Sequence, residues 1–262
     1  MSYRYLLDLA LILLSTKVLS LVTKRFKLPQ VVGSLLAGLI LGPAVLNIIH
    51  ETDFIKQLAE VGVIVLLFNA GLESNLSEFK KSGKTSFIVA VMGVMIPLIG
   101  GTILAYCINH GKVENVSVFV QNIFIGSVLT ATSVSITVET LRELGKVSTS
   151  VGNIIVGAAI IDDVLGMLVL TIITSLAGSS VSVIKVIVKI VGFFIFSIIV
   201  GIITYKLFNK WVDKYDIDKR RFVIVSFVIC LLLSFSAEEF FGVADITGAY
   251  IAGLVLSSNR ET

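Results

Sequence analysis

The sequence predicts an all-α polytopic membrane protein, and three observations support this fold class. Hydrophobic residues make up 56% of the 262 residues and charged residues only 15%. A water-soluble domain of this composition has too few charges to cover its apolar surface. The apolar residues also come in runs of about 20, the length of helix that crosses a bilayer. Lysine and arginine gather in alternate segments between those runs, as in the loops of a membrane protein.

The apolar runs are expected to form about nine transmembrane helices. In chain order they cover residues 3–22, 29–49, 55–72, 86–108, 118–138, 151–177, 183–208, 222–241 and 246–257. The third and the ninth runs are short for a helix that must cross the bilayer. Each run begins or ends near charged or turn-forming residues, which sets its approximate boundaries.

The basic residues predict how the chain is oriented in the cell membrane. Fifteen lysines and arginines fall in the loops of one side and five in those of the other. The richer side is expected to be cytoplasmic, so the N-terminus is expected to lie outside. The net charge of +3 then reflects membrane topology. No basic stripe with interleaved aromatic residues predicts a nucleic-acid partner.

A short internal repeat predicts how the helices are organised. The segment GSLLAGLIL at 33–41 matches GAYIAGLVL at 248–256, and each copy is the second apolar element after a basic segment. An odd number of spans between the copies would insert them with opposite orientation, as in inverted-repeat transporters. The expected units are a first six-helix repeat at 1–178, a linker helix at 179–215 and an incomplete second repeat at 216–262.

Small residues within the runs are interpreted as packing residues rather than chemical groups. Glycine lets two helices approach closely in a membrane. The glycines expected to do so are Gly33, Gly38, Gly42, Gly157 and Gly166. Both cysteines, Cys107 and Cys230, fall within or at the ends of spans and predict neither a disulfide nor a metal site.

Two adjacent aspartates, Asp162 and Asp163, lie near the middle of the sixth run. A carboxylate there costs about 2.5–3.5 kcal/mol on membrane-insertion scales, so both are expected to face a cavity. Two carboxylates so close together rarely ionise together in a low dielectric, and the pair is expected to accept a proton. The alternative role is a buried carboxylate that pairs with a lysine on a neighbouring helix.

The preceding run contains TATSVSIT at 130–137, with five hydroxyl side chains in eight positions. Hydroxyl-bearing and β-branched residues are poor helix formers. A broken helix in lipid survives only where it lines a cavity or contacts protein, and its freed oxygens suit an alkali cation. A regular helix, with each hydroxyl bonded to the preceding turn, is the equal alternative.

Four segments then resemble a known family. They are LPQVVGSLLAGLILGP at 28–43, LLFNAGLESNL at 66–76, LTATSVSITVETLRELGK at 129–146 and VGAAIIDDVLG at 156–166. Together they resemble the second family of monovalent cation:proton antiporters, especially sodium/proton antiporters of the Nap and Ger type. The resemblance implies an inverted-repeat fold in which two discontinuous helices cross. Members usually have twelve or thirteen spans, so it also implies that this chain lacks the C-terminal third.

The resemblance assigns the site residues. Asp163 matches the acid that binds cation and proton alternately, and Asp162 matches its neighbour, so these two would hold the transported alkali cation. Thr130, Thr132 and Ser133 match the first crossing helix. Glu73 matches a recurring acidic position, although an ordinary interfacial carboxylate is an equal interpretation.

The expected function is secondary transport that exchanges Na⁺, or K⁺, for protons by alternating access around the aspartate pair. The resemblance further implies a homodimer in the lipid bilayer, with no cofactor and no enzymatic activity. An intramembrane aspartyl protease is disfavoured, because adjacent aspartates on one helix diverge and do not share a proton. A transport-inactive fragment, or an assembly partner of a transporter, is the other candidate. On the expectation that the second crossing helix is missing, the chain alone should not exchange ions.

Overall fold

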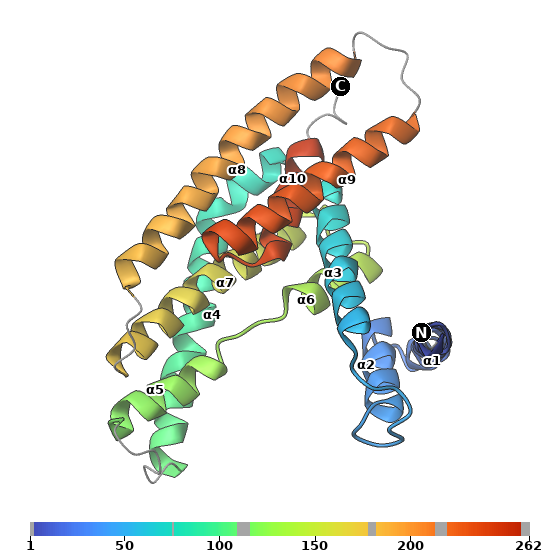
Figure 1. The fold of residues 1–262 in the computed structure, drawn as a ribbon. Coiled ribbons are helices and arrows are strands. Elements are labelled where there is room, and N and C mark those ends of the chain that lie inside the picture. The colour runs from blue at the N-terminus through green and yellow to red at the C-terminus, as the bar shows by residue number, and fades with distance from the viewer. Residues whose placement is uncertain (1–2, 75, 109–115, 178–181, 213–218, 258–262) are drawn as a thin grey trace.

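A computed structural model describes residues 3–74, 76–108, 116–177, 182–212 and 219–257, and these ranges contain helices and no strand (Figure 1). In chain order the helices are α1 (Arg4–Arg25), α2 (Gln30–Leu41), α3 (Asp53–Glu73), α4 (Leu76–Ile108), α5 (Val118–Val128), α6 (Val134–Glu143), α7 (Ser150–Leu176), α8 (Val183–Val212), α9 (Lys219–Ser236), the π-helix η1 (Ala237–Phe241) and α10 (Asp245–Ser257). Every predicted apolar run therefore contains at least one helix.

Among the described residues, six apolar helical segments are long and apolar enough to cross a membrane. Three other apolar helices, α2, α5 and α10, are shorter than a full span. The predicted run 29–49 is helical only to Leu41, because Gly42 and Pro43 follow and proline cannot continue the hydrogen-bonding pattern. The chain then turns back, and the amide of Leu46 donates to the carbonyl of Ile40 at 2.9 Å. A polytopic helical protein is thus confirmed, the helix of the second run is shorter than predicted, and the number of spans stays a prediction.

The run predicted at 118–138 is not one helix. α5 ends at Val128 and α6 begins at Val134, with residues 129–133 outside any helix. Of the two interpretations of the hydroxyl-rich stretch, the structure has the broken helix. The break is shorter than the motif, because Val134 and Ile136 are helical in spite of their β-branched side chains.

The run predicted at 222–241 ends differently from a regular helix. α9 passes directly into the π-helix η1, which ends at Gly242 with φ of 64°. Glycine adopts this left-handed conformation without a steric penalty and commonly ends helices. The wider turn of η1 was not predicted from the sequence.

The orientation of the chain stays a prediction. Within the basic segment from Lys206 to Arg221, residues 213–218 lie outside the described residues. The predicted loop residues Lys112 and Arg260 also lie outside them.

The core forms where α3 crosses α10. A Cβ atom added to Gly71 would overlap the carbonyl oxygen of Tyr250, and one added to Gly253 would overlap that of Phe68. The two backbones therefore touch, with glycine on both sides. The hydroxyl of Tyr250, a fully buried residue, donates to Ser74 Oγ at 3.1 Å. This crossing joins the first part of the chain to its last described helix.

The glycine predictions were right in part. A Cβ on Gly33 would overlap the backbone of Leu19 and Ser20, and one on Gly157 would press on Ser86, so both allow close approach. The prediction was wrong for Gly38, Gly42 and Gly166 within the described chain. No other element lies within 4 Å of the Cβ position at these three residues.

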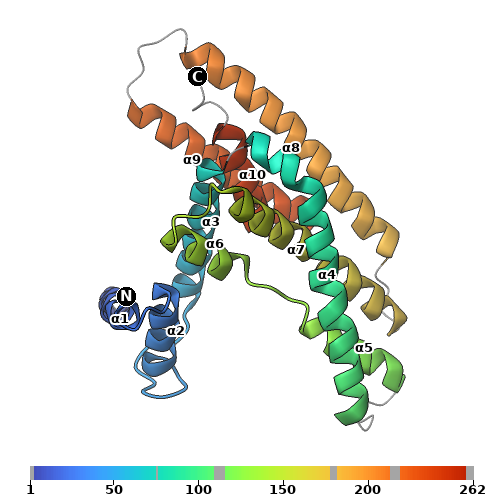
Figure 2. The ribbon, with the colours of Figure 1, turned by 180° about the vertical axis from the view of Figure 1, so that it is seen from behind.

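The break in the α5–α6 segment separates two groups of helices. α5 packs on α4 and α7, whereas α6 packs on α3, α7 and α2. Figures 1 and 2 show α5 beside α4 and α6 beside α3. An extended, non-helical stretch of chain joins α5 to α6. A short non-helical segment therefore links the two groups.

Candidate functional site

The segment 129–133 holds the hydroxyls that were predicted to form the site. Thr130 is 4% exposed, and its Oγ1 donates to the carbonyl of Ser127 at 2.7 Å, which closes the last turn of α5. Ser133 is the N-cap of α6, where its Oγ accepts from the amide of Ile136 at 3.4 Å. Thr130 and Ser133 therefore hold the facing ends of the two half-helices.

The same segment leaves backbone groups unpaired. Within the described part of the chain, the amides of Ala131, Thr132 and Ser133 make no hydrogen bond. The C-terminus of α5 has a partial negative charge and the N-terminus of α6 a partial positive charge, and both point into the segment. Such groups are tolerated in a membrane only beside protein, water or a bound ion.

Asp162 lies where α7 contacts α4. Its side chain is 7% exposed, and its Oδ1 lies 3.8 Å from the place where a Cβ on Gly93 of α4 would be. That oxygen is buried and has no hydrogen-bond partner among the described residues. A side chain at 93 would therefore come into van der Waals contact with a carboxylate oxygen that nothing in the described chain satisfies.

Thr132 brings the broken segment to this carboxylate. Its side chain lies close enough to Asp162 to interact with that carboxylate. The other contact of the Thr132 hydroxyl, to the carbonyl of Thr130, is 3.4 Å long and therefore weak. Two segments predicted separately from the sequence, 130–133 and 162–163, meet at this pair of side chains.

Asp163 is half-buried and interacts electrostatically with Asp162. Adjacent side chains on a helix point about 100° apart, so the two carboxylates face different directions. Among the described residues no lysine, arginine or histidine forms an ion pair with either aspartate. The alternative, in which a lysine on a neighbouring helix pairs with one of these carboxylates, is therefore not supported by the described residues.

Glu73, the last residue of α3, lies away from the aspartate pair and beside the C-terminal end of α6. Its Oε1 accepts from Arg142 Nη2 at 3.1 Å, and both side chains are about two-fifths exposed, at 37% and 41%. α6 has ten residues, so about 15 Å of helix separates this ion pair from Thr132. The geometry favours the interfacial interpretation of Glu73 over a place beside the aspartates.

Two residues near the site were not predicted from the sequence. Gly93 lies next to the Asp162 carboxylate, and the carboxylate of Glu143 accepts from the amide of Gln30 at the start of α2. Gly93 looks like any other glycine in an apolar helix. Glu143 did give a signal, because an acidic residue in the last turn of a helix opposes the helix dipole and needs a partner elsewhere.

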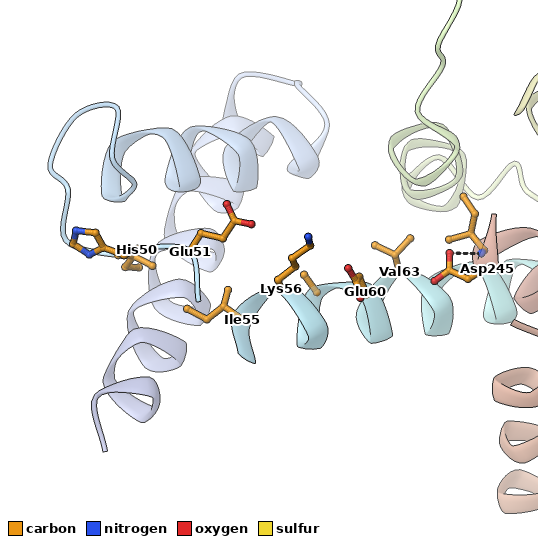
Figure 3. A pocket seen from close by; sticks show the side chains of 10 residues that line it. His50, Glu51, Ile55, Lys56, Glu60, Val63 and Asp245 are labelled. Atoms are coloured by element: carbon orange, nitrogen blue, oxygen red, sulfur yellow. Dashed lines mark hydrogen bonds between the residues drawn. The ribbon is translucent and has the colours of Figure 1, made fainter. Parts of the chain in front are cut away.

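A cavity of about 510 Å³ lies along α3, and neither Asp162 nor Asp163 lines it (Figure 3). His50 lies at one end and Asp245 at the other, with Lys56 and Glu60 between them. The Asp245 carboxylate accepts from the amide of Ile246 at 2.7 Å. No group of three or more His, Cys, Asp or Glu residues in the described ranges could hold a metal ion.

A second cavity, of about 690 Å³, is almost entirely apolar and lies between α7, α8 and α10. It touches α7 at Gly157, Ile160 and Ile161. Asp162 and Asp163 line neither of these two cavities. Neither of these two cavities is therefore the one predicted around Asp162 and Asp163.

Comparison with known proteins assigns the family. The chain is 38% identical over 257 residues to the probable Na⁺/H⁺ antiporter GerT of Bacillus cereus. The aligned residues are 97% of this chain and 65% of that protein. It is 35% identical to the Na⁺/H⁺-K⁺ antiporter GerN of the same organism, over 99% and 65% of the two chains. A Na⁺/H⁺ antiporter of Enterococcus hirae is 34% identical, over 96% and 64%.

The chain therefore spans about 65% of the length of these curated relatives. The family model described as "Sodium/hydrogen exchanger, transmembrane" matches residues 10–262. That family consists of transporters rather than enzymes, in agreement with the expectation from the sequence. The chain belongs to the sodium/hydrogen exchanger family.

Proposed function

We propose that this chain exchanges Na⁺, or K⁺, for protons across a membrane by alternating access around Asp162 and Asp163. Thr130, Thr132 and Ser133 would offer hydroxyl and carbonyl oxygens, the hard ligands that suit an alkali cation. The aspartates would take a proton when the cation leaves. The cation and the proton are the substrates, and neither is a resident cofactor.

One observation carries this proposal. A buried carboxylate, with one oxygen that has no partner in the described chain, lies beside a hydroxyl in a broken membrane helix. Burying such a group costs free energy, and ionisable residues inside a membrane usually mark an ion pathway. The names of the relatives, which are sodium/proton antiporters, support the same chemistry.

The test uses proteoliposomes that contain a pH-sensitive dye and a sodium gradient. Two preparations are compared: the chain alone, and the chain co-expressed with the C-terminal third of the GerT relative. Sodium-driven pH change that disappears in the Asp163→Asn variant would support the proposal. If neither preparation exchanges ions, the alternative is favoured, in which the chain is an inactive fragment or an assembly partner.

We also propose the repeat organisation predicted from the sequence, with units at 1–178, 179–215 and 216–262. Gly33 lies against Leu19 and Ser20 of α1, and Gly248 lies against Leu233 and Ser234 of α9. The matching segments thus use the same glycine to contact the helix before them. A Gly33→Leu and a Gly248→Leu variant should both separate their helix pairs, as measured by loss of cysteine crosslinks across each pair.

We further propose a homodimer with the N-terminus outside the cell. α1 packs on α2, its buried residues are Asp8, Ser20 and Thr23, and it leaves a broad apolar face exposed. Size-exclusion chromatography with light scattering would test the dimer. For orientation, His50→Cys should react with a membrane-impermeant thiol reagent in intact cells, and Lys27→Cys should not.

A further inference from the structure

We infer that Glu143 is a positioning residue for the ion site, an inference that rests on the proposed function. Glu143 fixes the C-terminal end of α6 to α2, and Thr132 and the N-cap Ser133 directly precede its other end. Its role is to hold the Thr132 hydroxyl beside Asp162. Glu143 itself does not touch the transported ions.

The contact has an unusual geometry for a surface carboxylate. Both oxygens, Oε1 and Oε2, lie 2.9 Å from the backbone amide of Gln30, from which they accept. Gln30 is the first residue of α2, and the residue before it is Pro29, whose side chain does not cap the helix. The amide of Gln30 belongs to the first turn, where no intrahelical partner exists, so Glu143 satisfies it from another helix.

Helix dipoles favour the same contact. Glu143 is the last residue of α6, where a negative charge is unfavourable, and it reaches the positive N-terminus of α2. The neighbouring Arg142 suits the C-terminus of α6 and pairs with Glu73, the last residue of α3. Two consecutive residues thus attach the end of α6 to two different helices.

The rest of α6 transmits this attachment to the site. Val134, Val138 and Leu141 are buried in the main core cluster, together with Leu67 and Phe68 of α3. A helix of ten residues packed along one face moves as a rigid body. If its C-terminal end is released, its N-terminal end shifts relative to α7, together with Ser133 and Thr132 just before it. Residues 129–131, which lie between α5 and Thr132, are not helical and offer no helical hydrogen bonds against that shift.

The variant Glu143→Ala tests the inference, with Glu139→Ala as the matched control. Glu139 has the same charge and lies one turn earlier on the same helix, but it does not contact Gln30. Spin labels at Ile136→Cys and Leu35→Cys, in a Cys107→Ser background, report the distance between α6 and α2. We expect Glu143→Ala to broaden that distance distribution and Glu139→Ala to leave it unchanged. An unchanged distribution in Glu143→Ala would overturn the inference.

The second measurement is the apparent KM for Na⁺, in whichever preparation exchanges ions. Loss of the helix cap should raise KM about five- to tenfold with a smaller change in kcat. Glu143→Gln keeps one acceptor oxygen and should give an intermediate value. Because Glu143 acts through Thr132, its effect should largely vanish in a Thr132→Ala background.

The outcomes separate the two proposals. Wild-type protein that exchanges no ions in either preparation contradicts the proposed function, whereas the spin-label distances still decide whether Glu143 holds α6. Exchange with a KM that Glu143→Ala does not change overturns the positioning role alone. Additive effects of Glu143→Ala and Thr132→Ala would likewise overturn it, because they would show that the two residues act independently.

Discussion

The α3–α10 contact and the α4–α7 contact are the two largest helix pairings of the described chain, and they differ in one buried polar group. Between α3 and α10 two glycines bring the backbones together, and the buried hydroxyl of Tyr250 is hydrogen-bonded. Between α4 and α7 a glycine, Gly157, also allows close approach, but the buried Oδ1 of Asp162 has no partner in the described residues. Both contacts are therefore close, and only the second contains a carboxylate oxygen that is left unsatisfied.

This difference separates stability from function. Close backbone packing and a hydrogen-bonded buried hydroxyl lower the free energy of the folded state. A buried oxygen without a partner raises it, and sites that bind ligands often retain such a cost. We therefore expect substitutions in the α3–α10 contact to change unfolding, and substitutions at Asp162 and Asp163 to change ion exchange.

The largest expected effect is the loss of ion exchange in Asp163→Asn, measured in the preparation that also contains the C-terminal third of the GerT relative. An amide neither accepts the proton nor presents a full charge to the cation, so the rate should fall to that of protein-free liposomes. Asp162→Asn should be milder and should change the charge moved per cycle. Internal pH and membrane-potential dyes would measure both, with Asp53→Asn at the exposed start of α3 as the control. Normal exchange by Asp163→Asn would refute the assignment.

Next in size is the destabilisation caused by Gly71→Ala. The added methyl group would overlap the backbone of α10, so the helices must separate, at a cost of about 2–3 kcal/mol. The control is Gly62→Ala on the same helix, where no atom lies within 4 Å of the new Cβ. Thermal unfolding in detergent should show a lower midpoint only for Gly71→Ala. Equal midpoints for the two variants would show that the close approach at Gly71 is not required.

A smaller effect, of opposite sign, is expected for Asp162→Asn. Burying an amide costs less than burying a carboxylate, so this variant should be more stable than wild type by about 1 kcal/mol. The unfolding midpoint at pH 8 should rise by about 2–4 °C. A lower midpoint would show that the Asp162 carboxylate is stabilised in the folded protein, and the contrast with the α3–α10 contact would fail.

Much of the fold could be predicted because the membrane simplifies the problem. Runs such as 151–177 must be helical to satisfy their backbone groups, so composition and length were enough. The break at 129–133 could be predicted as one of two alternatives, since hydroxyl and β-branched residues weaken a helix locally. The break ends at Val134 because Ser133 caps α6. The sequence did not single out Ser133 as the cap, because several neighbouring residues also have hydroxyl side chains.

Contacts between distant segments were harder to predict. The bond from Glu143 to Gln30 joins residues 113 positions apart, and nothing local specifies that pairing. The meeting of Thr132 with Asp162 was expected only from the family resemblance, because adjacent spans do not fix which faces touch. The difference between Gly71, which touches another helix, and Gly38, which does not, likewise depends on the neighbouring helices rather than on the residue.

The smallest expected effect is that of Tyr250→Phe, which removes one hydrogen bond from the α3–α10 contact. The ring keeps its contact with Phe79, whose centroid lies 5.9 Å away, so packing is unchanged. Ser74 keeps the bond that it donates to the carbonyl of Ala70 at 2.8 Å, and only its acceptor oxygen loses a partner. The loss should therefore be about 1 kcal/mol in the free energy of unfolding.

Tyr106→Phe is the control for this last variant, because Tyr106 is 75% exposed and its hydroxyl is not enclosed by the protein. Thermal unfolding of both variants should show a lower midpoint for Tyr250→Phe alone. The decrease should be less than half of that in Gly71→Ala, since close packing contributes more than one neutral hydrogen bond. A decrease as large as that of Gly71→Ala would mean that the buried hydroxyl, rather than the glycine pair, holds α10 on α3.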